Sequence, residues 1–369
     1  MQVIIHDPRI SSKQGGSEVR HALFARYLLE CGVQVIIYTL KTNQPSPNYL
    51  SLLKEKSRLK IVEIAKESLL ENTIFKSEDE EVDIAVRFSI TVCGSYRNYP
   101  NTCIITSFVP DLIGLDIHNK IVSFFAGLPP SRLIAKKEEK YLNRANKVIC
   151  VSNYINKIAT RYYPNINKQK FITVANGIDP LFLRKQRKNK KLNMKVFYSG
   201  RLTQRKGVHF LLKALYKLKN LGFEYSLTIA GDGPYKENLI NLCNDLDLDN
   251  QVKFLGVMDR ESIKEIADAS SYFVYPVSKP EGFGNSVLEA MSRGCLVIST
   301  ALGGISDFLN SSNSIIIKKN NIKDIVDSFI DISSDKKRFR KLVNNGIKTS
   351  NEYTQENTFK NYFDILNEK

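Results

Sequence analysis

The stretch YFVYPVSKPEGFGNSVLEAM, residues 272–291, contains the strongest fold signal in the sequence. Its first four residues are apolar or aromatic and predict a buried parallel strand. The loop that follows contains Glu281 and the glycines Gly282 and Gly284, which let a backbone approach a ligand closely. A helix is expected to begin near Gly284, with its free amide groups directed at that loop. This order of strand, glycine loop and helix predicts an α/β unit with an anion site.

The same alternation continues on both sides, so the second half of the chain is predicted to form one α/β domain. Its expected strands are 195–198, 226–230, 252–255, 272–275, 296–299 and 314–317. Helices are expected to begin near Gly207, Tyr235, Glu261, Gly284 and Ile305, and the last three at 323–331, 335–344 and 358–367.

The first half shows the same pattern less clearly. An apolar run at 3–5, a helical spacing at 17–30 and a second run at 33–38 predict a βαβ unit with a parallel sheet. Further expected elements are strands at 82–86, 102–106, 121–125, 147–151 and 171–174, and a charged helix at 131–144. Residues 184–191, with six basic side chains and almost no apolar ones, are expected to form a solvated linker.

The predicted fold class is therefore α/β, with two Rossmann-like, doubly wound, parallel-sheet domains. The N-terminal domain is expected at 1–180, a basic linker at 181–194 and the C-terminal domain at 195–354. Open parallel sheets bind ligands at the carboxyl ends of their strands. We therefore expect the two domains to face each other across a cleft that holds the site.

Composition and residue spacing favour a globular protein with two cores, an anionic partner and no metal site. The 369 residues are 43% hydrophobic, which suffices for two cores, and the net charge of +16 favours an anionic partner. The six cysteines lie far apart, and Cys31, Cys150 and Cys295 are expected to be buried, reduced thiols. The four histidines have no chelating spacing, so we expect no metal site. Neither a signal peptide nor a membrane-spanning segment is expected.

Two pairs of charged residues are candidates for chemistry. Glu281 beside the loop and Glu289 on the helix could bind the hydroxyls of a ribose or a hexose. In the segment YSGRLTQRKG, residues 198–207, Arg201 and Lys206 could clamp a diphosphate. The structural alternatives are a solvated carboxylate at a helix start and a solvated basic loop.

Glycine pairs mark further strand-to-helix turns. Gly15-Gly16 precedes the first helix, Gly231-Asp232-Gly233 follows a strand, and Gly303-Gly304 follows the next strand beyond the Glu281 loop. Alone, each indicates only a turn. No turn carries the Gly-x-Gly-x-x-Gly pattern after the first strand that a dinucleotide oxidoreductase needs.

Taken together, these motifs resemble those of the family 4 glycosyltransferases, which have the GT-B fold. The matching stretches are GGSE at 15–18, VICVS at 148–152, VANGID at 174–179, YSGRLTQRKG at 198–207, IAGDGP at 229–234, FLG at 254–256, PEGFGNSVLEAM at 280–291 and GGISD at 303–307. They occur in the family's order along almost the whole chain. The resemblance also implies that a C-terminal helix, within 355–369, crosses back to complete the N-terminal domain.

The resemblance implies a role for each matched residue. Glu281, Arg201 and Lys206 would be catalytic: the cations would bind the donor diphosphate and Glu281 the hydroxyls of the transferred sugar. The implied donor-binding residues are Gly15, Gly16, Gly200, Gly233, Gly282, Phe283, Gly284, Asn285 and Glu289, with Glu289 on the ribose. Members of the family retain anomeric configuration and need no metal and no other cofactor, because cations and a helix N-terminus stabilise the leaving diphosphate.

One motif departs from the family pattern. Many members have Leu-His-Gly after a strand of the first domain, where this chain has Phe125-Ala126-Gly127. His118 lies close in sequence but is not a clear replacement. The identity of the sugar is therefore open.

The expected partners follow from the resemblance and the charge. They are a nucleotide sugar, with a UDP-sugar favoured over GDP-mannose, and a glycan or lipid-linked acceptor of cell-surface polysaccharide or lipopolysaccharide synthesis. A basic cluster, Arg132, Lys136, Lys137, Lys140, Arg144 and Lys147, either faces an anionic acceptor at the inner leaflet or is a solvated helix face. The expected location is the cytoplasm or the inner face of the cell membrane. The alternatives are a non-catalytic nucleotide-sugar-binding protein and a nucleic-acid-binding protein, although no nucleic-acid-binding module is present and no nucleic acid is expected as a partner.

Overall fold

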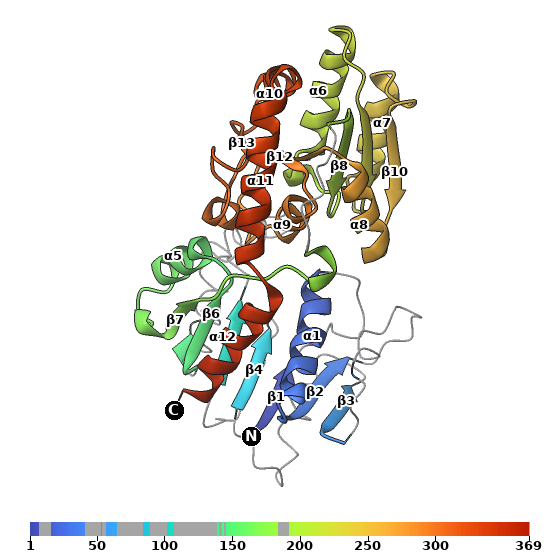
Figure 1. Cartoon of the computed structure of the whole chain (residues 1–369). Coiled ribbons are helices and arrows are strands. Elements are labelled where there is room, and N and C mark those ends of the chain that lie inside the picture. Colours follow the sequence, from blue (N-terminus) through green and yellow to red (C-terminus); the bar gives the residue numbers. More distant parts are fainter. Residues whose placement is uncertain are drawn as a thin grey trace, which may run out of the picture. The chain divides into compact units, whose positions relative to one another are not determined.

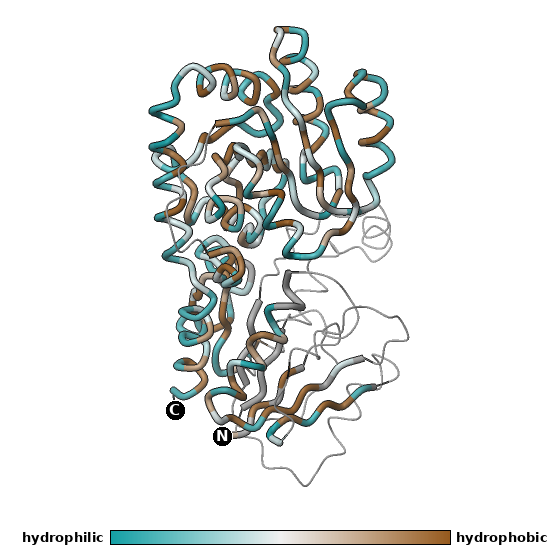
Figure 2. Tube along the Cα trace, turned by 45° about the vertical axis from the view of Figure 1, so that its right-hand side comes forward, coloured by the Kyte–Doolittle hydropathy of each residue, from teal (hydrophilic) through white to brown (hydrophobic). Residues whose placement is uncertain are grey.

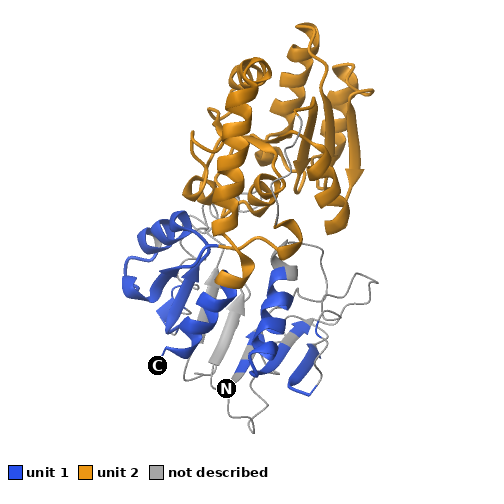
Figure 3. Ribbon diagram, viewed as in Figure 1, with its two compact units in different colours: residues 1–175, 358–369 blue, residues 176–357 orange. Residues whose placement is uncertain are grey.

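The computed structural model describes residues 1–6, 16–40, 53, 57–64, 84–88, 102–106, 139, 142–143, 145–183 and 192–368. These residues form two compact units (Figure 3). The first comprises Met1–Ala175 and Thr358–Lys369, and the second Asn176–Asn357. The boundary lies before the expected domain end at 180, because the backbone of Ile178 pairs with Thr354 in the second unit.

The first unit is built on a seven-stranded parallel sheet in the order β3-β2-β1-β4-β5-β6-β7. Its strands are β1 Gln2–His6, β2 Gln34–Leu40, β3 Leu59–Ile64, β4 Ile84–Phe88, β5 Thr102–Thr106, β6 Lys147–Cys150 and β7 Phe171–Thr173. The described helices are α1 Gly16–Glu30, α5 Asn153–Tyr162, the short 3-10 helix η3 Lys168–Lys170 and most of α12 Gln355–Asn367 (Figure 1). The sequence did not predict β3, and the expected strand at 121–125 lies outside the described residues.

The C-terminal helix α12 packs on α1 within the first unit. The ring of Phe24 on α1 lies 5.4 Å from the rings of both Phe359 and Tyr362 on α12. In the first turns of α12, the Thr358 hydroxyl donates to the carbonyl of Ala175 over 2.9 Å. Residues from Thr358 onward therefore belong to the core of the first unit, although the preceding helix belongs to the second.

The second unit is built on a six-stranded parallel sheet in the order β10-β9-β8-β11-β12-β13. Its strands are β8 Lys195–Ser199, β9 Ser226–Ala230, β10 Val252–Gly256, β11 Tyr272–Tyr275, β12 Leu296–Ser299 and β13 Ile315–Ile316. Its helices are α6 Val208–Asn220, α7 Lys236–Asp245, α8 Arg260–Ala269, α9 Asn285–Ser292, α10 Ile322–Ser334 and α11 Lys336–Glu352, with 3-10 turns η4 Pro180–Phe182, η5 Gln204–Lys206 and η6 Gly304–Asp307. Figure 2 shows hydrophobic residues along the inner strands, while the outer helices alternate between hydrophilic and hydrophobic residues.

Two predictions at this level were wrong. The helix expected from Ile305 is only the short 3-10 turn η6, because Phe308 and Leu309 immediately turn into the core. Cys31 is exposed, since it lies in the turn that ends α1, whereas Cys150 and Cys295 are buried free thiols as expected. Burial raises the pKa of the Cys150 thiol to about 12.

Candidate functional site

The order of strands in the second unit reverses between β8 and β11, and the loops with charged motifs follow these two strands. From β8 the chain continues to β9 and β10 on one side, while β11 and β12 lie on the other. Such a switch point is where open α/β sheets bind ligands, beyond the carboxyl ends of the strands. The loop after β8 contains Arg201 and Lys206, and the loop after β11 contains Glu281.

The loops after β8 and β11 contact each other through their backbones. The amide of Ser278 donates to the carbonyl of Arg205 over 2.8 Å. At Gly207, φ is +74° and an added Cβ would lie 2.0 Å from the carbonyl oxygen of Pro276, so only glycine fits there. These contacts keep Lys206 on one loop and Glu281 on the other close to each other.

Lys206 and Glu281 form a buried ion pair at this point. The Lys206 Nζ lies 2.9 Å from Glu281 Oε2, and the two residues are only 9% and 8% exposed. The same Nζ donates to the hydroxyl of Tyr275, at the end of β11, over 2.5 Å. A buried pair of charges costs desolvation energy and contributes little to stability. The Lys206–Glu281 pair is therefore a candidate for a functional site.

The second carboxylate oxygen of Glu281 forms an ion pair without a hydrogen bond among the described residues. The Arg205 Nη2 lies 3.4 Å from Glu281 Oε1, but this buried oxygen accepts no hydrogen bond from the described residues. The backbone of Glu281 is fixed by its amide, which donates to Leu302, and by the amide of Gly304, which donates to its carbonyl. A rigid carboxylate with an unsatisfied oxygen is suited to accept a hydrogen bond from a hydroxyl group.

The loop from Gly282 to Asn285 leads directly into α9. Gly284 has a φ of +99°, and no side chain caps the helix after it. The first amides of α9 and its positive dipole end can therefore interact with an anion. Phe283 anchors the loop, because its buried ring packs on Phe308 and Tyr353, with centroids 5.4 and 5.9 Å away.

Glu289, inside α9, has a different partner. The Arg260 Nη2 on α8 lies 2.9 Å from Glu289 Oε1, and the Arg260 Nε lies 2.9 Å from Asp179 Oδ2. The guanidinium also stacks over the Phe182 ring at 4.8 Å. Burial lowers the pKa of Arg260, but the two carboxylates outweigh this effect, so the pKa is raised. Glu289 is thus held in a fixed orientation by a permanently charged arginine.

The loop after β8 is tied to the loop after β9. The amide of Gly200 donates to Ala230, and the amide of Leu202 donates to the carbonyl of Asp232. A Cβ added at Gly233 would lie 2.3 Å from the carbonyl oxygen of Leu202, so Gly233 permits this approach. Arg201 itself is exposed, and its guanidinium forms no ion pair with any residue that the structure describes.

Some predicted residues lie elsewhere or outside the described ranges. Gly16 is the first residue of α1 in the first unit. Gly15, the 125–127 motif, His118 and the basic linker at 184–191 fall outside the described residues, as does most of the expected 131–144 helix with its basic cluster. Lys147, the last member of that cluster, is described and pairs with Glu368 at 2.8 Å.

Sequence reasoning missed three residues of this site. Arg205 and Tyr275 contact the Lys206–Glu281 pair, and Arg260 holds Glu289. Arg205 adjoins Lys206 and Tyr275 ends the strand before the Glu281 loop, so both positions could have been considered. No local signal distinguishes Arg260, because its two partners lie 81 and 29 residues away in sequence.

Most of the second unit matches a known family of glycosyltransferases. Residues 181–349, which include most of the second unit, match the family described as "Glycosyl transferases group 1". The Lys206–Glu281 pair, the Gly284 turn and Glu289 all lie inside the matched region.

Solved structures confirm the predicted GT-B fold. The Anabaena protein HepE, solved in complex with UDP and glucose, matches with a TM-score of 0.76 at 17% identity, and 99% of each chain is covered. WaaG, a glycosyltransferase involved in lipopolysaccharide biosynthesis, matches with a TM-score of 0.73 at 15% identity over the full length of both chains. At these identities the likeness shows the fold alone.

Curated relatives match over shorter stretches. One component of the human phosphatidylinositol N-acetylglucosaminyltransferase is 25% identical over 317 residues, which cover 84% of this chain and 64% of that protein. The matches to the first curated relatives span between 29% and 64% of the relatives' own lengths.

Proposed function

We propose that this chain is a retaining, metal-independent glycosyltransferase. It moves a hexose or an N-acetylhexosamine from a nucleotide sugar to a glycan or glycolipid acceptor in the synthesis of cell-surface polysaccharide or lipopolysaccharide. The observation that carries the proposal is the buried Lys206–Glu281 pair at the switch point of the second unit, beside the uncapped start of α9.

The donor's parts correspond to different groups of the site. The diphosphate carries negative charge and suits the exposed Arg201, the Lys206 ammonium and the first amides of α9. The sugar hydroxyls suit the unsatisfied Oε1 of Glu281. The ribose hydroxyls suit Glu289, whose orientation Arg260 fixes.

In the proposed reaction the bond between the sugar C1 and the diphosphate oxygen breaks, and its electrons remain on the diphosphate. The acceptor hydroxyl forms the new bond to C1 from the same face, and its proton passes to the departing diphosphate oxygen. Arg201, Lys206 and the α9 dipole stabilise the charge that develops on the diphosphate, which is the task a divalent metal performs in other transferases. Neither Glu281 nor Glu289 forms a covalent intermediate in this scheme.

Two considerations support the donor and the acceptor class. HepE, a relative in fold, is solved with UDP and glucose, which favours a UDP-sugar over GDP-mannose. WaaG acts in lipopolysaccharide biosynthesis, and the net charge of +16 favours an anionic acceptor at the inner face of the membrane. Within the part of the chain that the structure describes, no helix has the length and apolar character needed to cross a bilayer.

A thermal-shift screen of UDP- and GDP-sugars tests donor binding, because a bound ligand stabilises a protein by mass action. We expect at least one nucleotide sugar to raise the melting temperature, equally in the presence of EDTA. Arg201→Ala should reduce this shift, since a charged hydrogen bond contributes about 1.5–3 kcal/mol. Arg340→Ala, another exposed arginine of the second unit, is the matched control and should leave the shift unchanged. A screen without any stabilising nucleotide sugar, or a shift that depends on added manganese, would contradict the proposal.

A further inference from the structure

Tyr275 lies at the end of β11, next to the Lys206–Glu281 pair. Its side chain is 2% exposed, and its hydroxyl accepts a hydrogen bond from the Lys206 ammonium. The ammonium also lies 5.0 Å from the centre of the Tyr275 ring. A buried tyrosine hydroxyl normally needs a hydrogen-bond partner, and here the partner is the cation itself.

The number of donors on Lys206 makes this contact directional. An ammonium group has three N–H donors. Within the described residues one donates to Tyr275 and one to Glu281 Oε2. With two directions fixed by buried acceptors, the third N–H has a defined direction and remains for a ligand.

The Tyr275 hydroxyl is itself held in place and kept neutral. Its ring stacks on Tyr198 of β8, with centroids 5.8 Å apart and an interplanar angle of 19°. Burial, followed by the charge of Glu281, raises its pKa well above the usual value, while a hydrogen bond with the Ser286 side chain acts in the opposite direction. The hydroxyl therefore stays protonated and connects Lys206 with the first turn of α9.

We propose that Tyr275 is a positioning residue that aims the free N–H of Lys206 at the donor's diphosphate. The inference rests on the proposed function, because it assumes that the ligand of Lys206 is a nucleoside diphosphate. In this account the direction of the ammonium matters as well as its charge.

The test compares Tyr275→Phe with Tyr272→Phe. Both variants remove one hydroxyl from the same strand, but the Tyr272 hydroxyl is buried without a hydrogen-bond partner among the described residues. The ligands are UDP and UMP, or GDP and GMP if the guanine nucleotide binds wild type better, measured by calorimetry. We expect Tyr275→Phe to weaken diphosphate binding about tenfold while monophosphate binding changes little. Without the Tyr275 hydroxyl, the Lys206 ammonium is no longer aimed at the diphosphate and loses its hydrogen bond to that charged group. A purely structural defect would weaken both ligands alike.

Lys206→Arg provides a second variant that keeps the charge. A planar guanidinium cannot offer the same three directions from a single atom. We therefore expect the same selective loss of diphosphate affinity. If both Tyr275→Phe and Lys206→Arg bind the diphosphate as tightly as wild type and Tyr272→Phe do, Tyr275 does not position Lys206, although the proposed function stands. If wild type itself binds neither diphosphate, the proposed function is wrong.

Discussion

Glu281 and Glu289 differ in what holds them, and this difference separates their expected roles. Glu281 lies in the loop before α9, paired with Lys206 and Arg205. Glu289 lies inside α9 and is paired with Arg260. Because the two carboxylates are held by separate cations, replacing one should not release the other.

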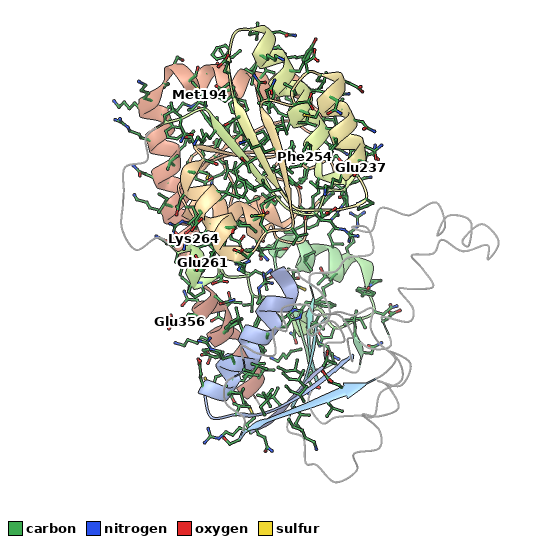
Figure 4. All side chains as sticks on the ribbon, turned by 90° about the vertical axis from the view of Figure 1, so that its right-hand side faces the viewer. Met194, Glu237, Phe254, Glu261, Lys264 and Glu356 are labelled. Atoms are coloured by element: carbon green, nitrogen blue, oxygen red, sulfur yellow. The ribbon has the colours of Figure 1, made fainter. Side chains whose placement is uncertain are left out.

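We expect the two glutamine variants to give different steady-state kinetics. Glu289→Gln should raise the donor KM about tenfold with little change in kcat, because ribose contacts are equal in the ground and transition states. Glu281→Gln should lower kcat by about 10- to 100-fold, since its contacts to the sugar would tighten as the glycosidic bond stretches. Glu237→Gln, on the exposed face of α7 and labelled in Figure 4, is the control. If Glu281→Gln turns over at the wild-type rate, Glu281 does not contact the transferred sugar.

At this scale the sequence predicted the charged residues but not their pairing. Lys206 and Glu281 stand in motifs with recognisable spacing, whereas ion pairs between residues 75 positions apart depend on which strands are neighbours. Cys31 shows the opposite failure. Its apolar surroundings in sequence predicted burial, but the turn after α1 exposes it.

Among the elements, the loop after β12 contacts the backbone of Glu281. Gly303 pairs with Glu281 as an isolated bridge, with φ at +75°. A Cβ at this position would lie 2.3 Å from the Glu281 carbonyl oxygen. The loop can therefore hold Glu281 only while residue 303 is glycine.

We expect Gly303→Ala to destabilise the protein by more than about 3 kcal/mol, because backbone strain and a backbone clash act together. Gly222→Ala is the matched control. It has a similar φ of +82° but no atom within 4 Å of an added Cβ, so it should cost only the strain of about 1–2 kcal/mol. Chemical denaturation measures both values. Equal losses for the two variants would show that the clash relaxes and that this loop does not fix Glu281.

Strands β11 and β12 were predicted at their observed bounds because they are buried on both faces. All four residues of β11 and of β12 are buried, which produces continuous apolar runs in the sequence. The edge strand β3 is instead interrupted by Lys60 and Glu63, and both are exposed, so no such run marks it. The helix expected to begin near Glu261 is the surface helix α8, and its Glu261 and Lys264, labelled in Figure 4, form an ion pair.

For the whole molecule, the restarted βα pattern predicted two parallel-sheet units, and the structure contains them. Their division could not be predicted to the residue. The 176–179 segment has the composition of a turn, and contacts with residues distant in sequence assign it to the second unit: backbone pairing with Tyr353 and Thr354, and the ion pair of Asp179 with Arg260.

The central claim is retaining, metal-free transfer from a nucleotide sugar. The most direct measurement is a proton NMR time course with the nucleotide sugar that stabilises the protein, a glycan or glycolipid acceptor and excess EDTA. We predict a new anomeric signal with the configuration of the donor, formed at the rate at which the nucleoside diphosphate appears, and formed more slowly with Arg201→Ala at the same concentrations. A product of inverted configuration, or turnover that begins only when a divalent metal is added, would contradict the account.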